Sequence, residues 1–242
     1  MNLSQYISSI KVKNLLMSVS GILLGSMLAF ADFHVSLTAV LFLILSVLCF
    51  QIIPNVIPGV LCALASVYFS YGTLFLLDSF IMMLLGYLVY RTVRRHGPEN
   101  GLFRNGPVIT LTSLLIYGII PVFGAYYVCT HSFGSYLLFL PSFAAGALCL
   151  AVRNAGYLTE TKDRIFHTVW IAAGVAAMTV YSCLRIYDLW HFLYLASLPL
   201  FVWLLSVMWK NRGEVETYEI KLAATVLLFC VLSGLGFMIY LF

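Results

Sequence analysis

Residues 13–32 read KNLLMSVSGILLGSMLAFAD, a mostly apolar stretch whose only charged residues are a lysine at one end and an aspartate at the other. The apolar core of a bilayer takes about 20 residues of α-helix to cross. The stretch therefore predicts a membrane-spanning helix with its basic end at one membrane face. Gly21 and Gly25 within it are four residues apart, a spacing that lets a neighbouring helix approach closely.

The same kind of stretch recurs along the 242-residue chain, which is 62% hydrophobic and 9% charged, with a mean hydropathy of +1.02. This composition excludes a soluble domain and predicts one all-α integral membrane domain over residues 1–242. Residues 59–92 are long for one span and short for two, so seven or eight spans are alternatives to the expected nine. The nine expected spans are 15–32, 36–57, 59–76, 78–92, 106–129, 134–153, 165–183, 188–208 and 220–241.

Charge predicts the orientation of these spans. Of the 13 basic residues, all but Arg185 fall on one side of the ladder of spans. Basic loops stay in the cytoplasm, so we expect a multi-pass protein of the bacterial inner membrane with its N-terminus inside and its C-terminus outside. The net charge of +4 then reflects anchoring to membrane lipids, and no nucleic acid is expected as a partner. The residues on the inner side are Lys11, Lys13, Arg91, Arg94, Arg95, Arg104, Arg153, Lys162, Arg164, Lys210, Arg212 and Lys221.

Two polar segments on the basic side are candidate binding sites. In residues 91–105, Arg91, Arg94 and Arg95 either anchor the chain to anionic headgroups or bind a diphosphate, since arginine suits bidentate contact with oxyanions. In residues 153–167, Glu160 and Asp163 are three residues apart and would share a helix face, where they could hold one Mg²⁺. A mixed-charge turn at the membrane surface is the favoured explanation of this second pattern. A third segment, residues 210–221 with Glu214, Glu216 and Glu219, is expected to be a solvated connector.

Several segments resemble the UbiA-type membrane prenyltransferases, in particular the 1,4-dihydroxy-2-naphthoate branch that makes menaquinone precursors. The most specific is residues 117–127, YGIIPVFGAYY. The resemblance covers nearly the whole chain and implies nine helices with an inside N-terminus. The segments that carry it are residues 13–26, 86–90, 96–98, 117–127, 153–162 and 198–200.

The resemblance implies a site that this chain has altered. Family members hold Mg²⁺ and an isoprenyl diphosphate on two aspartate-rich motifs, because the metal neutralises the charge of the leaving diphosphate. In the first motif Asn55 matches the leading asparagine, but Pro58 and Gly59 stand where an Asn-Asp pair is expected. The second motif keeps Asn154, Glu160 and Thr161, whereas Ala155, Leu158 and Lys162 replace its second asparagine and both aspartates.

Two main functions follow from these expectations. The favoured one is a catalytically degenerate homologue that binds a prenylated lipid or quinone, with a membrane protein as a further partner. The alternative is a divergent prenyltransferase in which Glu160 and Asp163 hold Mg²⁺ and Asn154, Glu160 and Asp163 are the catalytic candidates. Its isoprenyl diphosphate would be bound by Asn55, Arg91, Arg94, Arg95, Lys162 and Arg164. A transporter is disfavoured because charges within the spans are nearly absent.

Overall fold

The computed structural model describes residues 12–33, 35–52, 57–71, 107–158, 161–185, 188–210 and 215–239, and within these ranges all regular structure is helical. The α-helices are α2 (Val12–Asp32), α3 (Leu37–Ile52), α4 (Ile57–Tyr71), α6 (Pro107–Leu114), α7 (Ile120–Thr130), α8 (Phe139–Asn154), α9 (Thr161–Leu184), α10 (Leu198–Lys210) and α11 (Val215–Met238). A π-helical turn, η2 (Leu115–Ile119), joins α6 to α7, and three 3₁₀ segments are η3 (Tyr136–Leu138), η4 (Ala155–Tyr157) and η5 (Leu189–Ser197).

Within the described ranges, six helical segments are long and apolar enough to cross a membrane: Val12–Asp32, Thr110–Thr130, Tyr136–Asn154, Thr161–Leu184, Leu189–Lys210 and Tyr218–Met238. The apolar helices α3 and α4 are shorter. The protein is therefore a helical, multi-pass membrane protein. Eight of the nine expected spans overlap described helices, and the ninth, 78–92, lies outside the described residues. The count of nine spans and the inside N-terminus stay predictions.

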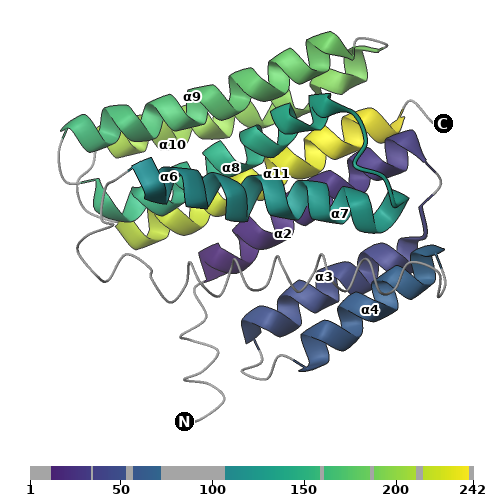
Figure 1. Ribbon diagram of the computed structural model, residues 1–242. Coiled ribbons are helices and arrows are strands. Elements are labelled where there is room, and N and C mark those ends of the chain that lie inside the picture. The colour runs from purple at the N-terminus through teal and green to yellow at the C-terminus, as the bar shows by residue number, and fades with distance from the viewer. Residues whose placement is uncertain are drawn as a thin grey trace.

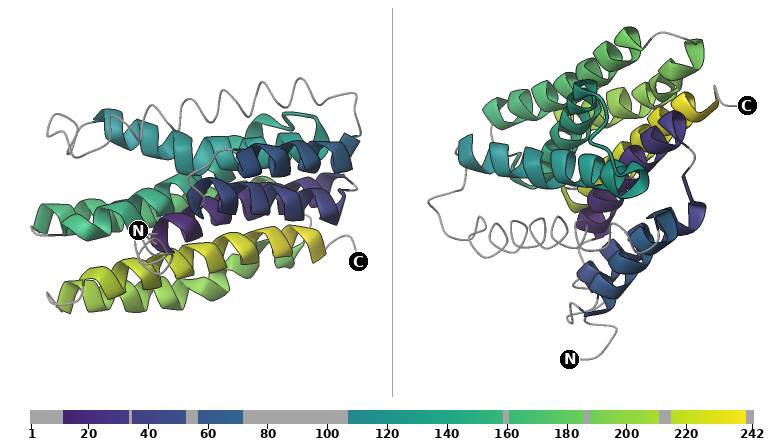
Figure 2. Two further views of the ribbon diagram at one scale, coloured as in Figure 1. Left: turned by 90° about the horizontal axis from the view of Figure 1, so that it is seen from below. Right: turned by 45° about the vertical axis from the view of Figure 1, so that its right-hand side comes forward.

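Helices α2, α8 and α11 form the centre of the bundle, with α9 and α10 on one side and α6 and α7 on another (Figures 1 and 2). Their facing side chains include Leu24, Leu148 and Phe229, which are fully buried. Small residues dominate the buried stretch of α8, which lets its neighbours approach closely.

Glycines mark the tightest contact of α2. A Cβ at Gly21 would lie 2.8 Å from the Cβ of Pro121, and one at Gly25 would clash with the backbone of Val122. The pair predicted to permit close helix packing therefore packs against α7, and the prediction is confirmed. The π-helical turn precedes this contact because Pro121 has no N–H to continue the α-helical ladder.

The hairpin of α3 and α4 lies to one side of the bundle (Figure 1). Two serine hydroxyls join its helices: Ser46 donates to the carbonyl of Gly59 at 2.8 Å, and Ser66 donates to that of Ala39 at 2.6 Å. A small cluster that includes Ile22, Leu43 and Val67 packs the hairpin against α2 and α7.

Candidate functional site

The candidate site lies at the end of the bundle where α2, α9 and α11 begin and where α8 and α10 end. We call it the basic end, because among the described residues it holds every lysine and arginine except Arg185. These residues are Lys13, Arg153, Lys162, Arg164, Lys210 and Lys221.

A largely buried ion pair joins two central helices near their starts at the basic end. Lys13 of α2 donates to the carboxylate of Glu219 on α11, and their side chains are only 19% and 11% exposed. The short segment η4 packs directly against this pair. A Cβ at Gly156, within η4, would collide with Oε1 of Glu219. The ion pair therefore lies directly beneath the segment that follows Asn154.

A second polar contact lies next to the ion pair. Nε2 of His167 on α9 and the hydroxyl of Tyr218 on α11 are 2.8 Å apart, and either atom can donate, depending on the histidine tautomer. His167 is fully buried. Its other ring nitrogen, Nδ1, is buried and has no hydrogen-bond partner in the described part of the chain. His167 thus links α9 to α11 beside the ion pair.

Asn154 ends α8, and its amide nitrogen Nδ2 is buried with no hydrogen-bond partner in the described part of the chain. The preceding residue, Arg153, points to another helix and donates to Oγ of Ser113 at 2.6 Å. A buried amide N–H without an acceptor costs about 1–3 kcal/mol, so a ligand oxygen placed there would relieve an existing deficit.

The other predicted site residues fall into two groups. Lys162, Asp163 and Arg164 lie in the first turn of α9, with Lys162 exposed and the other two half-buried. Asn55, Arg91, Arg94, Arg95 and Glu160 lie outside the described residues. The Glu160–Asp163 metal site accordingly stays a prediction. Among the described residues, no group of three or more His, Cys, Asp or Glu could hold a metal ion.

The prediction of a solvated connector over residues 210–221 is wrong for its second half. Helix α11 begins at Val215, and Glu219 is 8% exposed. The connector prediction took the three glutamates as one polar run. The position of Glu219 in the sequence could have predicted its burial. Glu219 lies just before the long apolar run 222–238 and so falls in the first turns of a span. No local pattern pairs Glu219 with Lys13, 206 residues earlier.

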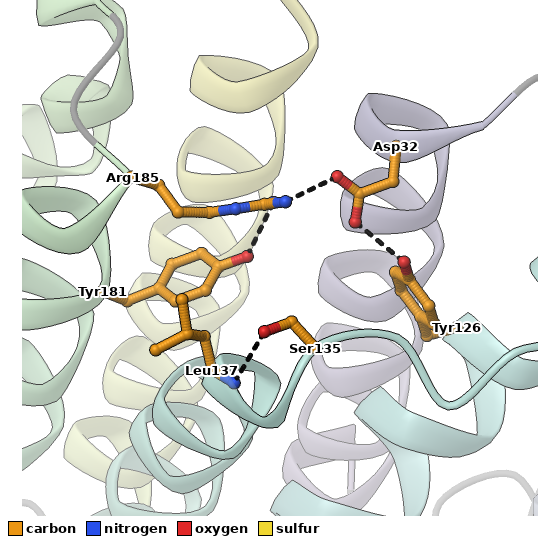
Figure 3. Close-up of polar contacts among 6 residues, drawn as sticks. All are labelled: Asp32, Tyr126, Ser135, Leu137, Tyr181 and Arg185. Atoms are coloured by element: carbon orange, nitrogen blue, oxygen red, sulfur yellow. Dashed lines mark hydrogen bonds and ion pairs between the residues drawn. The ribbon is translucent and has the colours of Figure 1, made fainter.

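The opposite end of the bundle explains why Arg185 departs from the charge pattern. Just past the end of α9, Arg185 donates to Asp32 of α2 at 2.8 Å and to the hydroxyl of Tyr181 at 3.1 Å (Figure 3). Tyr126 of α7 donates to the other oxygen of Asp32 at 2.8 Å. Burial by itself lowers the pKa of Arg185, but Tyr181 and Asp32 outweigh it, and the net shift is upward. We call these four residues the Asp32–Arg185 cluster, and it binds the ends of three helices together.

No protein-family model, curated protein or solved structure matches the chain.

Proposed function

We propose that this membrane protein is a homologue of the UbiA-type prenyltransferases, of the 1,4-dihydroxy-2-naphthoate branch, and that it binds a prenylated lipid or quinone at its basic end without catalysing prenyl transfer. The observation that carries the proposal is a mismatch of polar groups at that end. The buried carboxylate there, Glu219, is already paired with Lys13, whereas the buried amide of Asn154 has no described acceptor.

The first half of the mismatch argues against metal-assisted transfer. Mg²⁺ needs several oxygen ligands, and a diphosphate leaves only when its charge is neutralised. Glu219 cannot serve as a free ligand while Lys13 neutralises it, and exposed Lys162 adds positive charge at the start of α9. A ligand with a neutral head group needs neither metal ligands nor neutralisation of its charge.

The second half favours a neutral oxygen acceptor. An amide N–H can donate to a quinone carbonyl or to a lipid hydroxyl without any change of charge. A prenyl tail is apolar and can run along the helices, in contact with bilayer and protein alike. A quinone with an isoprenoid tail joins both properties in one molecule.

The test is to purify the protein in detergent, extract the bound lipids and identify them by mass spectrometry. We expect a prenylated quinone or lipid from the wild type, much less from Asn154→Asp, and wild-type amounts from Tyr136→Phe, a control at an 80% exposed position outside the basic end. Asn154→Asp keeps the side-chain size but removes the amide donor. Equal ligand in all three proteins would overturn the assignment of Asn154.

A transfer assay separates the binding protein from the enzyme. The purified protein in nanodiscs receives geranyl or farnesyl diphosphate, 1,4-dihydroxy-2-naphthoate and Mg²⁺, with and without a chelator, beside an active prenyltransferase as control. We expect no product. Chelator-sensitive product that is lost in Glu160→Ala would show a working enzyme with a reduced carboxylate set and would refute the binding role.

We further propose that the basic end faces the cytoplasm of a bacterial cell, with nine spans in total, because twelve of the thirteen basic residues would then be inside. A reporter fused after Phe242 tests this. We expect alkaline phosphatase to be active and green fluorescent protein to be dark at this position. The reverse result would mean an even number of spans or an inverted protein.

A further inference from the structure

Lys221 is a charged residue on the outer surface of a membrane helix. It lies one turn inside the apolar segment Tyr218–Met238 and is exposed. Its neighbours on the same surface of α11 are the exposed Ile220, Ala224 and Leu228. In a multi-pass protein, an exposed apolar helix surface faces lipid, so Lys221 reaches lipid at the level where head groups meet acyl chains.

The charge of Lys221 is not neutralised within the described part of the chain. No described carboxylate forms an ion pair with it; Glu219 is close in sequence but pairs with Lys13. Residues that are two positions apart in an α-helix differ by about 200° around its axis, so Glu219 and Lys221 point to nearly opposite sides of α11. One therefore faces the bundle and the other faces its surroundings.

An indole ring lies beneath the ammonium group. Nζ of Lys221 is 5.7 Å from the centre of the Trp203 ring on α10, and Trp203 is itself 51% exposed. A cation–π contact holds the lysine side chain of α11 against α10. It leaves the three N–H donors of the ammonium group free to meet an anion above the ring.

We propose that Lys221 and Trp203 form a binding site for an anionic phospholipid on the surface of α10 and α11. The ammonium group of Lys221 would bind the lipid phosphate, and the acyl chains would lie along the exposed apolar residues Val202 and Leu228. Membrane proteins hold anionic lipids in this way, with basic residues at the cytoplasmic level and apolar helix surface beneath them. The site is separate from Asn154 and does not depend on the function proposed there.

Native mass spectrometry can count the lipids bound to the purified protein after exchange into phosphatidylcholine with a minor share of phosphatidylglycerol. We expect the wild type to retain phosphatidylglycerol selectively. Lys221→Gln should lower this preference about fivefold, which corresponds to the roughly 1 kcal/mol that one basic residue contributes at a charged membrane surface. Trp203→Leu should lower it less, because the charge remains.

Lys210→Gln is the matched control. Lys210 is exposed at the end of α10, and no cation–π contact is described for it, so its loss removes the same charge without touching the site. Lys221→Arg should keep the preference and shows that Lys221→Gln does not act by misfolding. Equal losses in Lys210→Gln and Lys221→Gln would mean diffuse surface charge and would overturn the site. An unchanged preference in Lys221→Gln, or displacement of the lipid by inorganic phosphate, would overturn it as well.

Discussion

The two ends of the bundle use charge in different ways. In the Asp32–Arg185 cluster, one carboxylate meets one guanidinium, and two tyrosine hydroxyls complete the hydrogen bonding. The basic end instead combines one buried ion pair with an excess of lysines and arginines and an unpartnered amide at Asn154. A cluster whose members satisfy one another is suited to holding helices together. An end with surplus charge and an unused donor is suited to binding something else.

The largest effect is expected at the buried pair of the basic end. Lys13→Met leaves the Glu219 carboxylate buried without its cation, and breaking a buried ion pair in this way costs about 3–5 kcal/mol. We expect a loss of stability near the lower value, since 11–19% of each side chain is exposed. Thermal unfolding in detergent measures it, and the double variant Lys13→Met with Glu219→Leu should recover most of the loss. If the double variant were as unstable as the single one, the pair would not be the cause.

A smaller loss is expected in the Asp32–Arg185 cluster. Its ionic side chains are 20% and 25% exposed, so water screens the charge that remains after substitution. Arg185→Gln should lower the free energy of unfolding by about 1–2 kcal/mol, between the values for exposed and buried pairs. A double-mutant cycle with Asp32→Asn gives the coupling energy. Independent effects of the two substitutions would show that the cluster does not tie α2 to α9.

Removing one hydroxyl at the basic end should cost still less. Tyr218→Phe deletes the partner of His167 Nε2 and leaves a buried ring nitrogen unpaired. Hydrogen bonds between membrane helices contribute about 0.6 kcal/mol on average, and we expect a loss near 1 kcal/mol because of the unpaired nitrogen. Tyr136→Phe, at an 80% exposed position, is the control and should leave the unfolding temperature unchanged.

The smallest effect on stability is expected at Asn154, and it shows whether this residue binds a ligand or supports the fold. Asn154→Leu removes a buried polar group that has no described partner, so the ligand-free protein should be unchanged or up to about 1 kcal/mol more stable. The same variant should lose the co-purified ligand. A clear loss of stability in lipid-free detergent would instead show that Asn154 supports the fold, and the contrast between the two ends would weaken.

Much of the fold could be predicted because each span is a local pattern. Apolar length placed eight of the nine expected spans on described helices, and the Gly21–Gly25 spacing indicated a close helix contact before its partner was known. Residues 210–221 were mispredicted because a polar sequence suggests exposure to solvent. Glu219 is instead buried and paired with Lys13 of α2. The site was predicted in outline only. Asn154 does end a helix, but His167 and Tyr218 were missed because their contact joins residues 51 positions apart.

By itself, the sequence determined the helical membrane architecture and the concentration of basic residues at the ends of the apolar segments, since both depend on hydropathy and charge over one helix length. Only the tertiary structure decided which of these charges are neutralised. Lys13, Arg185 and Lys221 look alike as basic residues at the ends of spans. The first is paired inside the bundle, the second belongs to a cluster that joins three helices, and the third is exposed on the bundle surface over an indole ring. The physical reason is that the energy of a charge near a membrane depends on its nearest neighbours, and those neighbours come from helices far away in the chain.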